Sequence, residues 1–381
     1  MRTILALAAL CLASCATTSA PPAALPVATA DVAVAADVQD SPDEFAAEVA
    51  APAAKPLPDG PPVQSVLNQD YLTRALQVIQ SAETRLDIVQ FEASSSDILD
   101  ILLGAVIQTA QRGVPVRVLF DDEISGNQVT LNRLLQAGVN AKLDNTKVRT
   151  HTKLILADKG FLVGSTNWSQ TSITKNNEAN VLVRDATAIA AMGKYAQALW
   201  DKPSYYSKIA TNQDKEVALY GDGDGKSVSS YQPLVVPLIK AAKTRILLCV
   251  YSLNVTAKEI SAKSSAVGAT VAEIQAAIGR GVEVRVILDQ SSFSSPESDG
   301  VNKASGQILK TMGATVRLDP LDTITHAKFL IVDDTLVVGT NNWGYMGFVD
   351  DHEAGVRTTD ATAVSDLTAF FEKIWAKSTA L

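Results

Sequence analysis

The chain carries the same pattern of polar and apolar residues twice, and this repeat constrains its fold more than any other feature of the sequence. The two copies are 175 residues apart over the whole pattern, from a histidine to a glutamate 27 positions later. A repeat of this length indicates two copies of one structural unit. The chemically distinctive residues that match are His151, Lys153, Asp158, Ser165, Asn167 and Glu178 in the first copy and His326, Lys328, Asp333, Thr340, Asn342 and Glu353 in the second.

The similarity continues upstream with small shifts. The segment 113–121 resembles 281–289 at an offset of 168, and the segment 85–91 resembles 245–251 at an offset of 160. Two short insertions in the second copy explain both shifts. The repeat therefore covers nearly all of the chain after its first 62 residues.

Both copies predict the same order of elements. The predicted helices are 69–82, 97–111, 127–136 and 186–200 in the first copy and 232–242, 270–279, 303–312 and 361–376 in the second. The predicted strands are 85–91 and 115–120, with a hairpin over 152–164, and 245–251 and 283–288, with a hairpin over 327–339. Helices that alternate with short apolar strands indicate an α/β fold with helices on both faces of the sheet. We therefore predict two homologous α/β/α sandwich halves, 63–205 and 206–381.

The first 62 residues predict export and tethering. Residues 1–14 combine Arg2 with an apolar run that is too short to span a bilayer, which is typical of a secretory signal. Leu12-Ala13-Ser14-Cys15 resembles a bacterial lipobox and predicts cleavage before Cys15 and its lipidation, although an ordinary signal peptide with an incidental cysteine remains an alternative. Residues 16–62 are rich in Ala and Pro and predict a disordered tether. This interpretation places the protein in the cell envelope, lipid-anchored to the outer membrane or to the periplasmic face of the inner membrane.

Charge and cysteine content narrow the range of partners. The whole chain has a formal charge of −8, but residues 63–381 hold 31 basic and 34 acidic side chains, a net charge of −3. A near-neutral body weakly disfavours non-specific nucleic-acid binding, which usually requires a basic face. Cys11 would leave with the signal and Cys15 would carry lipid. Cys249, in an apolar run, is therefore expected to be buried without a disulfide partner in the chain.

The spacing within the motif predicts that its polar side chains gather at one sheet edge. Residues two apart in a strand point to the same side, so His151 and Lys153 share a face, as do the equivalent His326 and Lys328. The returning strands of the predicted hairpins end at Gly164 and Gly339, just before the Ser/Thr and Asn positions. Each half would thus present an imidazole, an ammonium, a hydroxyl and an amide together.

Phosphodiester cleavage requires such a set. A nucleophile attacks phosphorus, an acid protonates the leaving oxygen, and histidine suits both tasks because its pKa lies near neutrality. Lysine, asparagine and Ser/Thr side chains can hold the non-bridging oxygens. Two halves that face each other would complete one site. The candidate phosphate-binding residues are Lys153, Ser165, Asn167, Lys328, Thr340 and Asn342.

Four further pairs or residues have open interpretations. Glu178 and Glu353 are either surface charges or partners of the imidazole N–H groups, where they would fix the tautomer and raise basicity. Asp158 and Asp333 belong to the candidate catalytic set as part of the motif, but their position in hairpin turns predicts a structural role. Two tryptophans, Trp168 and Trp343, lie either at the cleft edge or in the core. His352, which has no counterpart in the first half, is interpreted as a rim residue.

The double His-x-Lys-x4-Asp pattern, with the Gly-Ser/Thr-x-Asn that follows each copy, resembles the phospholipase D superfamily over residues 65–378. Thr340 stands where serine is more usual. The resemblance implies two halves related by a pseudo-two-fold axis, with both motifs at their interface. It also implies catalysis without metal or cofactor, through a phosphohistidine and then hydrolysis or transfer. His151 would be the nucleophile and His326 the general acid.

Several functions remain compatible with the sequence. The leading hypothesis is a lipid-anchored phosphodiesterase that hydrolyses a phospholipid headgroup ester, with the membrane and a phospholipid as its partners and the monomer as its expected state. An envelope endonuclease that cleaves DNA or RNA is the main alternative, and a cardiolipin synthase-like phosphatidyltransferase is another. A non-catalytic scaffold is disfavoured because both motifs are intact. Fold alone cannot decide the substrate.

Overall fold

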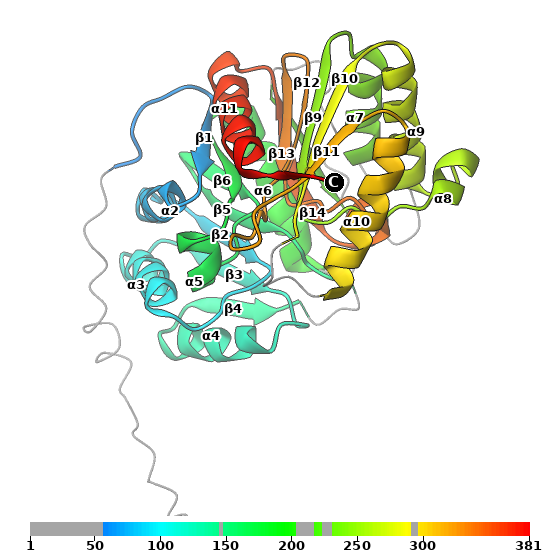
Figure 1. Ribbon diagram of the computed structural model, residues 1–381. Helices are drawn as coiled ribbons and strands as arrows, with labels where there is room; N and C mark the ends of the chain where they lie inside the picture. Colours follow the sequence, from blue (N-terminus) through cyan, green and yellow to red (C-terminus); the bar gives the residue numbers. More distant parts are fainter. Residues whose placement is uncertain (1–55, 145–147, 203–216, 223–230, 291–295) are drawn as a thin grey trace, which may run out of the picture. The chain divides into compact units, whose positions relative to one another are not determined.

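A computed structural model of the protein describes residues 56–144, 148–202, 217–222, 231–290 and 296–381 (Figure 1). The predicted signal, Cys15, most of the predicted tether and the junction between the halves near residue 205 lie outside the described residues. Within the described part, none of the helices combines the length and apolarity that crossing a membrane requires.

The first half is built on one mixed sheet. Its strands are β1 (Val63–Leu67), β2 (Leu86–Gln90), β3 (Val116–Phe120), β4 (Asn140–Leu143), β5 (Lys153–Ala157), β6 (Gly160–Gly164) and β7 (Ala179–Val183). They lie in the order β1-β7-β6-β5-β2-β3-β4, with β2, β3 and β4 parallel and the other neighbours antiparallel. Because β5 runs antiparallel to β2, Lys153 pairs with Gln90 at the carboxyl end of β2. The first motif therefore begins at the edge where the parallel strands end.

The second half repeats this sheet with one added strand. Its strands are β8 (Val217–Asp222), β9 (Arg245–Val250), β10 (Glu283–Leu288), β11 (Thr315–Leu318), β12 (Lys328–Val332), β13 (Thr335–Gly339), β14 (Glu353–Thr358) and β15 (Thr379–Ala380). Their order is β15-β11-β10-β9-β12-β13-β14-β8. Lys328 pairs with Val250 at the carboxyl end of β9, so the second motif occupies the equivalent edge.

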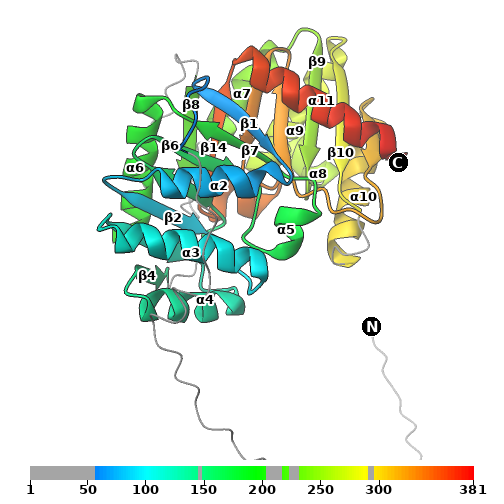
Figure 2. The same ribbon diagram turned by 90° about the vertical axis from the view of Figure 1, so that its left-hand side faces the viewer.

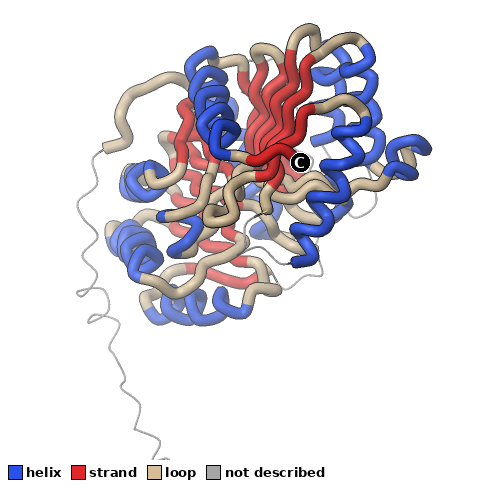
Figure 3. The backbone as a smooth tube through the Cα atoms, viewed as in Figure 1, coloured by secondary structure: helices blue, strands red, loops and turns tan. Residues whose placement is uncertain are grey.

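The helices cover the outer faces of the sheets and fill the space between them (Figures 1 and 3). They are α2 (Asp70–Gln80), α3 (Asp97–Gln111), α4 (Ser125–Gln136), α5 (Gln170–Thr174), α6 (Ala186–Asp201), α7 (Tyr231–Ala241), α8 (Ala257–Ala262), α9 (Ala266–Gly279), α10 (Pro296–Thr311), the π-helix η1 (Met346–Asp350) and α11 (Ala361–Lys377). Helices α2 and α3 lie on the outer face of the first sheet, as Figure 2 shows from that side. Helices α7 and α9 pack in the equivalent cluster of the second half.

The two halves share one apolar core. The cluster between the sheets combines strand residues of both halves, such as Leu154 and Phe329, with side chains of α6 and α11. Cys249 belongs to this cluster and is buried, as predicted. Burial of apolar area is worth roughly 25 cal/mol per Å², so a core drawn from both halves holds them together strongly. The prediction of two related α/β halves is confirmed, with an inner layer that the halves build jointly.

The predicted elements are confirmed with small shifts at their ends, except that α10 starts at Pro296, seven residues before its predicted start. Several short strands were missed. Strand β7 starts directly after Glu178 and strand β14 starts at Glu353. Neither was predicted, because a short apolar run with a small residue gives little periodic signal. The edge strands β1, β8 and β15 were missed for the same reason. Helix α9 begins at Ala266, four residues before its predicted start, where the Ser265 side chain accepts a hydrogen bond from Gly268 N (3.1 Å).

Four glycines explain why the repeat persists upstream of the motifs. Gly113 and Gly281 follow α3 and α9, and Gly138 and Gly313 follow α4 and α10. All four have positive φ angles, between 75° and 105°. Glycine adopts this left-handed conformation without a steric cost, and it commonly ends helices for that reason.

The two tryptophans that follow the motifs lie in the core. Trp168 and Trp343 are 0% and 1% exposed, and each indole N–H donates to a buried tyrosine hydroxyl, that of Tyr71 (3.0 Å) or Tyr231 (3.1 Å). Burial of a tryptophan requires such a partner for its N–H group. The alternative position at the cleft edge is therefore wrong.

The motif aspartates stabilise the edge opposite the histidines. Asp333 accepts hydrogen bonds from the backbone N–H groups of Lys243 (2.9 Å), Thr244 (2.9 Å) and Arg245 (3.0 Å), at the start of β9. Asp158 accepts the equivalent hydrogen bonds from the backbone N–H groups of residues 83–85, just before β2. Both lie at the far end of the strands that begin beside the histidines, so their place in the candidate catalytic set is wrong and their predicted structural role stands.

We expect Asp333→Asn to lower the free energy of unfolding by about 1–2 kcal/mol, because the amide loses the charge and one acceptor. Partial burial opposes ionisation of Asp333, but these hydrogen bonds outweigh it and lower the pKa to about 2. The contribution is thus complete above the unfolded pKa near 3.8 and is lost as the pH falls through about 2. Urea unfolding measures it, and the exposed neighbour in Asp334→Asn is the control. Equal stability of the two variants at neutral pH would contradict the assignment.

Candidate active site

Each motif histidine is hydrogen-bonded to the glutamate of the other half. His151 Nδ1 lies 2.9 Å from Glu353 Oε1, and His326 Nδ1 lies 3.1 Å from Glu178 Oε1. Contacts that are reciprocal in this way are the signature of a two-fold relation between the halves. The four side chains are buried or nearly so, and the glutamates are imidazole partners, not surface charges. The bond at Nδ1 fixes the tautomer and leaves Nε2 for a substrate.

Backbone hydrogen bonds also cross from each half to the other beside the histidines. The carbonyl of Asn177 accepts from the N–H groups of His326 and Ala327 (both 2.9 Å), and His352 N–H donates to the carbonyl of Arg149 (2.8 Å). Asn177 and His352 immediately precede the two glutamates. His352 is therefore buried in the interface, at 1% exposure, and its predicted place at the rim is wrong.

The two lysines lie beside the histidines, as the strand spacing predicted. Lys153 Nζ donates to the carbonyl of His151 (2.6 Å), and Lys328 Nζ to that of His326 (2.5 Å). Burial lowers the pKa of Lys153 to about 8 and that of Lys328 to about 7, although both glutamates oppose the shift. The charge of Lys153 is one of the causes that lower the pKa of Lys328, so the two ammonium groups lie near enough to act on one anion.

An aromatic ring supports each histidine–lysine pair. Phe91 meets the His151 ring edge-on at a centroid distance of 4.9 Å, and Tyr251 meets His326 at the same distance. Lys153 Nζ lies 4.7 Å from the centre of the Phe91 ring. Both aromatic residues come directly after β2 and β9, at matching positions of the repeat. The match between Phe91 and Tyr251 is visible in the sequence, but nothing in the sequence places these rings beside the histidines.

The motif hydroxyls face the glutamates and not the cleft. Ser165 Oγ donates to Glu178, and Thr340 Oγ1 donates to Glu353. Both residues are fully buried at 0% exposure. The prediction that they bind phosphate is therefore wrong, because their hydroxyl groups hold the carboxylates that hold the histidines.

We expect Thr340→Val to lower kcat about tenfold, because it removes a hydrogen bond of about 1–1.5 kcal/mol from Glu353. Thr340→Ser keeps the hydroxyl and should retain nearly full activity. Steady-state kinetics of the two variants measures the difference. Equal losses in both would contradict the role of the hydroxyl group, because only the valine variant lacks it.

The two motif asparagines, Asn167 and Asn342, each have a side-chain oxygen that is available to a ligand. Asn167 Nδ2 donates to Glu92 Oε2 (2.9 Å). The Oδ1 atoms of Asn167 and Asn342 are buried and have no hydrogen-bond partner among the residues that the structure describes. Buried amide groups are rarely left unpaired, so these two oxygens are the natural acceptors for an O–H or N–H group of a bound ligand. Glu92, which orients Asn167, was not predicted, since its counterpart in the repeat is Ser252.

The two glutamates have unequal surroundings. Glu178 accepts hydrogen bonds from Ser172 and Asn176 as well as from Ser165, whereas the matching positions in the second half are Gly347 and Asp351. Burial raises the pKa of Glu178, but His326 and its hydrogen bond outweigh burial and lower it. Burial, and then the charge of Asp351, raise the pKa of Glu353. Glu178 is thus more strongly ionised than Glu353.

Comparison with known proteins agrees with this geometry. The sequence profile of the family described as "Cardiolipin synthase, PLD-like domain" matches residues 75–200 and 235–375. The chain belongs to this family. Each matched segment lies within one of the two halves, so the repeat seen in the sequence corresponds to two PLD-like units.

Relatives with assigned names share part of the PLD-like chain. A mitochondrial cardiolipin hydrolase of Chlamydomonas reinhardtii is 32% identical over 34% of this chain, and the match spans 57% of the algal protein. The mitochondrial cardiolipin hydrolase of Mus musculus is 30% identical, with 41% of this chain and 71% of that protein covered. A probable phospholipase D of Caenorhabditis elegans is 22% identical over 79% of this chain and 65% of its own length.

Solved structures show the same fold. The crystal structure of phosphatidylserine synthase from Haemophilus influenzae matches with a TM-score of 0.64 and 12% identity, over 84% of this chain and 87% of that chain. A polyphosphate kinase from Porphyromonas gingivalis matches with a TM-score of 0.61 and 12% identity, over 84% and 48% respectively. At such identities the likeness concerns the fold alone.

Buried aspartates hold the backbone just before each histidine of the PLD-like site. Asp121 Oδ2 accepts from Thr150 N–H (2.7 Å), and Thr325 N–H donates to both Asp289 (2.8 Å) and Asp319 (3.0 Å). These aspartates follow the parallel strands β3, β10 and β11. The sequence match between Asp121 and Asp289 was visible, but nothing in it showed that they orient the histidines.

One group of side chains has donor atoms close enough to hold a metal ion. The ligand atoms of His151, Asp351 and Glu353 lie within 4.8 Å of one another. In this arrangement Glu353 already accepts from His151 and Thr340. The buried ammonium groups of Lys153 and Lys328 would also repel a cation, so the donor set does not fit a metal well.

Proposed function

We propose that this PLD-like chain is a phosphodiesterase of the phospholipase D type that hydrolyses the headgroup ester of a phospholipid. One observation carries the proposal. Two histidines, each bonded at Nδ1 to a glutamate of the opposite half, lie with two buried lysines in a single site. Such a site supplies a nucleophile, an acid and a charge clamp in one place.

The reaction follows from these groups. Nε2 of one histidine attacks phosphorus, and the bond from phosphorus to the headgroup oxygen breaks as the other histidine donates a proton to that oxygen. Lys153 and Lys328 hold the non-bridging oxygens, with amide groups of Asn167 and Asn342 beside them. The second histidine then takes a proton from water, which attacks the phosphohistidine. The products are phosphatidic acid and the headgroup alcohol, and no cofactor takes part.

A phospholipid substrate is supported by the names of the relatives and by the expected anchor. The relatives include proteins named cardiolipin hydrolase, and a structural neighbour is named phosphatidylserine synthase. Lipidation of Cys15 would hold the enzyme at the envelope membrane, within reach of phospholipid. Both halves of the site come from one chain, so a monomer suffices.

Transfer to an alcohol is the second candidate, favoured by the family description as cardiolipin synthase. It shares the phosphohistidine and differs only in the acceptor of the phosphatidyl group. An excess of glycerol or phosphatidylglycerol in the assay would divert the product from phosphatidic acid to the transfer product.

The test is an activity screen of the purified chain with EDTA present. Phosphatidylglycerol, cardiolipin, phosphatidylethanolamine and phosphatidylcholine are offered separately, beside plasmid DNA and RNA, with the His151→Ala variant as control. We expect phosphatidic acid, or phosphatidyl transfer, from at least one phospholipid. Cleavage of nucleic acid without cleavage of any phospholipid would replace the proposal with the nuclease alternative.

A further inference from the structure

The two halves differ in the segments that border the active site. Between the motif tryptophan and the glutamate, the first half has Ser-Gln-Thr-Ser-Ile-Thr-Lys-Asn-Asn and the second has Gly-Tyr-Met-Gly-Phe-Val-Asp-Asp-His. Gln170 and Thr171 are exposed at the start of α5, and the matching Tyr345 and Met346 are 53% and 40% exposed at the start of η1. At these exposed positions one border of the site is thus polar and the other apolar.

The same asymmetry holds at the aromatic ring beside each histidine. Tyr251 packs against His326 and brings a phenol group, whereas Phe91 packs against His151 and brings none. The exposed polar pair, Gln170 and Thr171, therefore lies on the His326 side, and the exposed apolar pair, Tyr345 and Met346, lies on the His151 side, where the charged groups Arg149 and Asp351 lie deeper.

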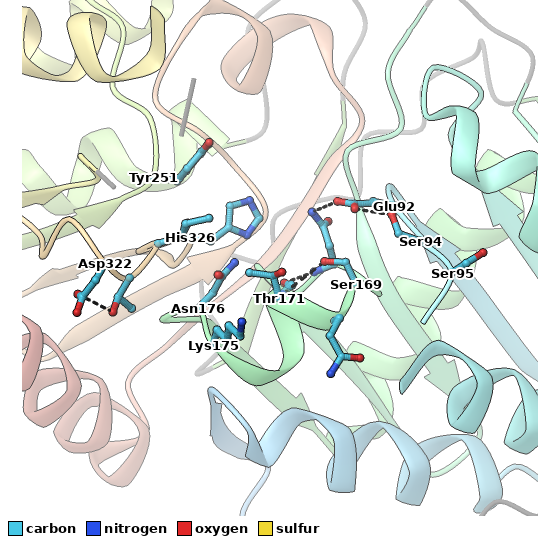
Figure 4. Close-up of a pocket in the computed structure, with 15 residues that line it drawn as sticks. Glu92, Ser94, Ser95, Ser169, Thr171, Lys175, Asn176, Tyr251, Asp322 and His326 are labelled. Carbon is cyan, nitrogen blue, oxygen red and sulfur yellow. Dashed lines mark hydrogen bonds between the residues drawn. The ribbon is translucent and has the colours of Figure 1, made fainter. Parts of the chain in front are cut away.

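A cavity of about 720 Å³ opens on the polar side (Figure 4). Helix α5 forms one wall, Glu92 and Ser94 come from the first half, and His326, Tyr251 and Asp322 come from the second. His326 lines this cavity, whereas His151 is not among the described residues that do.

The lining favours a hydroxyl-bearing, uncharged ligand. Most of it consists of Ser, Thr, Asn and Gln side chains. Among the described lining residues the charged groups apart from His326 are one ammonium, Lys175, and two carboxylates, Glu92 and Asp322. A groove for a polyanion would present several Lys or Arg side chains, and a cage for a quaternary ammonium would present several aromatic rings. Neither pattern is present among these residues.

We propose, on the basis of the function proposed above, that this cavity receives the leaving headgroup alcohol of a phospholipid whose headgroup carries free hydroxyl groups. The acyl side of the same lipid lies over Tyr345 and Met346. The substrate then binds in one orientation only, although the fold is nearly symmetric.

The proposed orientation agrees with the roles of the histidines that the family resemblance implies. In a phosphoryl transfer the attacking and leaving atoms lie roughly in line on opposite sides of phosphorus. With the headgroup on the His326 side, His326 donates the proton to the departing oxygen, and His151 forms the bond to phosphorus. The unequal glutamates agree, because the well-ionised Glu178 supports a protonated His326.

A substrate that needs no acid tests the assignment. In phosphatidyl-p-nitrophenol the leaving phenolate departs without protonation. We expect His326→Ala to release a burst of one nitrophenolate per chain and to retain a phosphatidyl group on His151, whereas His151→Ala releases none. Thermal unfolding of both variants, with His326→Gln as a second version, establishes that they fold. A burst from His151→Ala, or from neither folded variant, would overturn the assignment.

An exchange of residues across the pseudo-symmetry tests the two subsites. Wild type should cleave phosphatidylglycerol or phosphatidylinositol at least tenfold faster than phosphatidylcholine, and Gln170→Tyr/Thr171→Met should abolish this preference. Tyr345→Gln/Met346→Thr should lower the rate on long-chain vesicles at least tenfold more than it lowers the rate on monomeric dihexanoyl substrate. The reverse pattern, or equal rates on all headgroups in wild type, would refute the orientation. If wild type cleaves no phospholipid and no nitrophenyl ester, the proposed function itself fails.

Discussion

Replacing either His151 or His326 with alanine should lower kcat/KM for a phospholipid by at least about 10³-fold. The reason is the cross-pairing of the halves: each imidazole is held by the glutamate of the other half, so both histidines belong to one site. Loss of the nucleophile removes the covalent step, and loss of the acid leaves a poor leaving group. Initial rates at saturating and limiting substrate measure the effect.

The third histidine provides a matched control. His352→Asn introduces the residue found at the equivalent position of the first half, Asn177, and keeps the backbone contact to Arg149. We expect this variant to keep activity within about threefold. Half of the wild-type activity in each of the His151 and His326 variants would mean two independent sites. Recovery of activity on mixing the two variants would mean that sites form between chains.

The sequence predicted the fold well because the repeat supplied the same information twice. A sequence signal for a helix or strand that is weak in one copy becomes convincing when the second copy shows it at the matching position. Two of the strands that escaped prediction are β7, which starts directly after Glu178, and β14, which starts at Glu353, and both are short. What periodicity could not show is that α6 and α11 lie between the sheets, since their apolar faces are the same whichever sheet they contact.

The composition of the site was predicted, but the pairing within it was not. His151 and Lys153 share an edge because strand spacing demands it. Which glutamate meets which histidine depends on how the halves face each other, and the sequence holds no local signal for that. The hydroxyls of Ser165 and Thr340 were misassigned for a related reason. Their direction is set by Glu178 and Glu353, whose role becomes evident only in three dimensions.

The departures from symmetry carry the functional information. Two identical halves would bind a phosphodiester equally well in both directions. Here Ser172 and Asn176 donate to Glu178, and their counterparts Gly347 and Asp351 supply no such donor. The repeat therefore identifies the shared chemistry, and the unmatched positions distinguish the tasks of the two histidines.

Glu178→Gln should impair catalysis far more than Glu353→Gln. Burial, followed by the charge of Lys328, lowers the pKa of His326, and Glu178 is the group that opposes this shift. Without the charge of Glu178 the pKa of His326 falls further, so its acid form survives only at lower pH. We expect kcat near pH 7 to drop by about 10²–10³-fold and the basic limb of the pH–rate profile to move to lower pH.

Glutamine should be tolerated better at position 353 than at position 178. Burial and Asp351 raise the pKa of Glu353, so its carboxyl group is already close to neutral and the amide resembles it. We expect a loss of about tenfold, with little displacement of the basic limb. Profiles of kcat from about pH 5 to 9 for both variants measure the contrast, and unfolding curves establish equal folding. Equal losses with equal displacements would show that the two dyads are interchangeable, and that the polar contacts around Glu178 do not make His326 the acid.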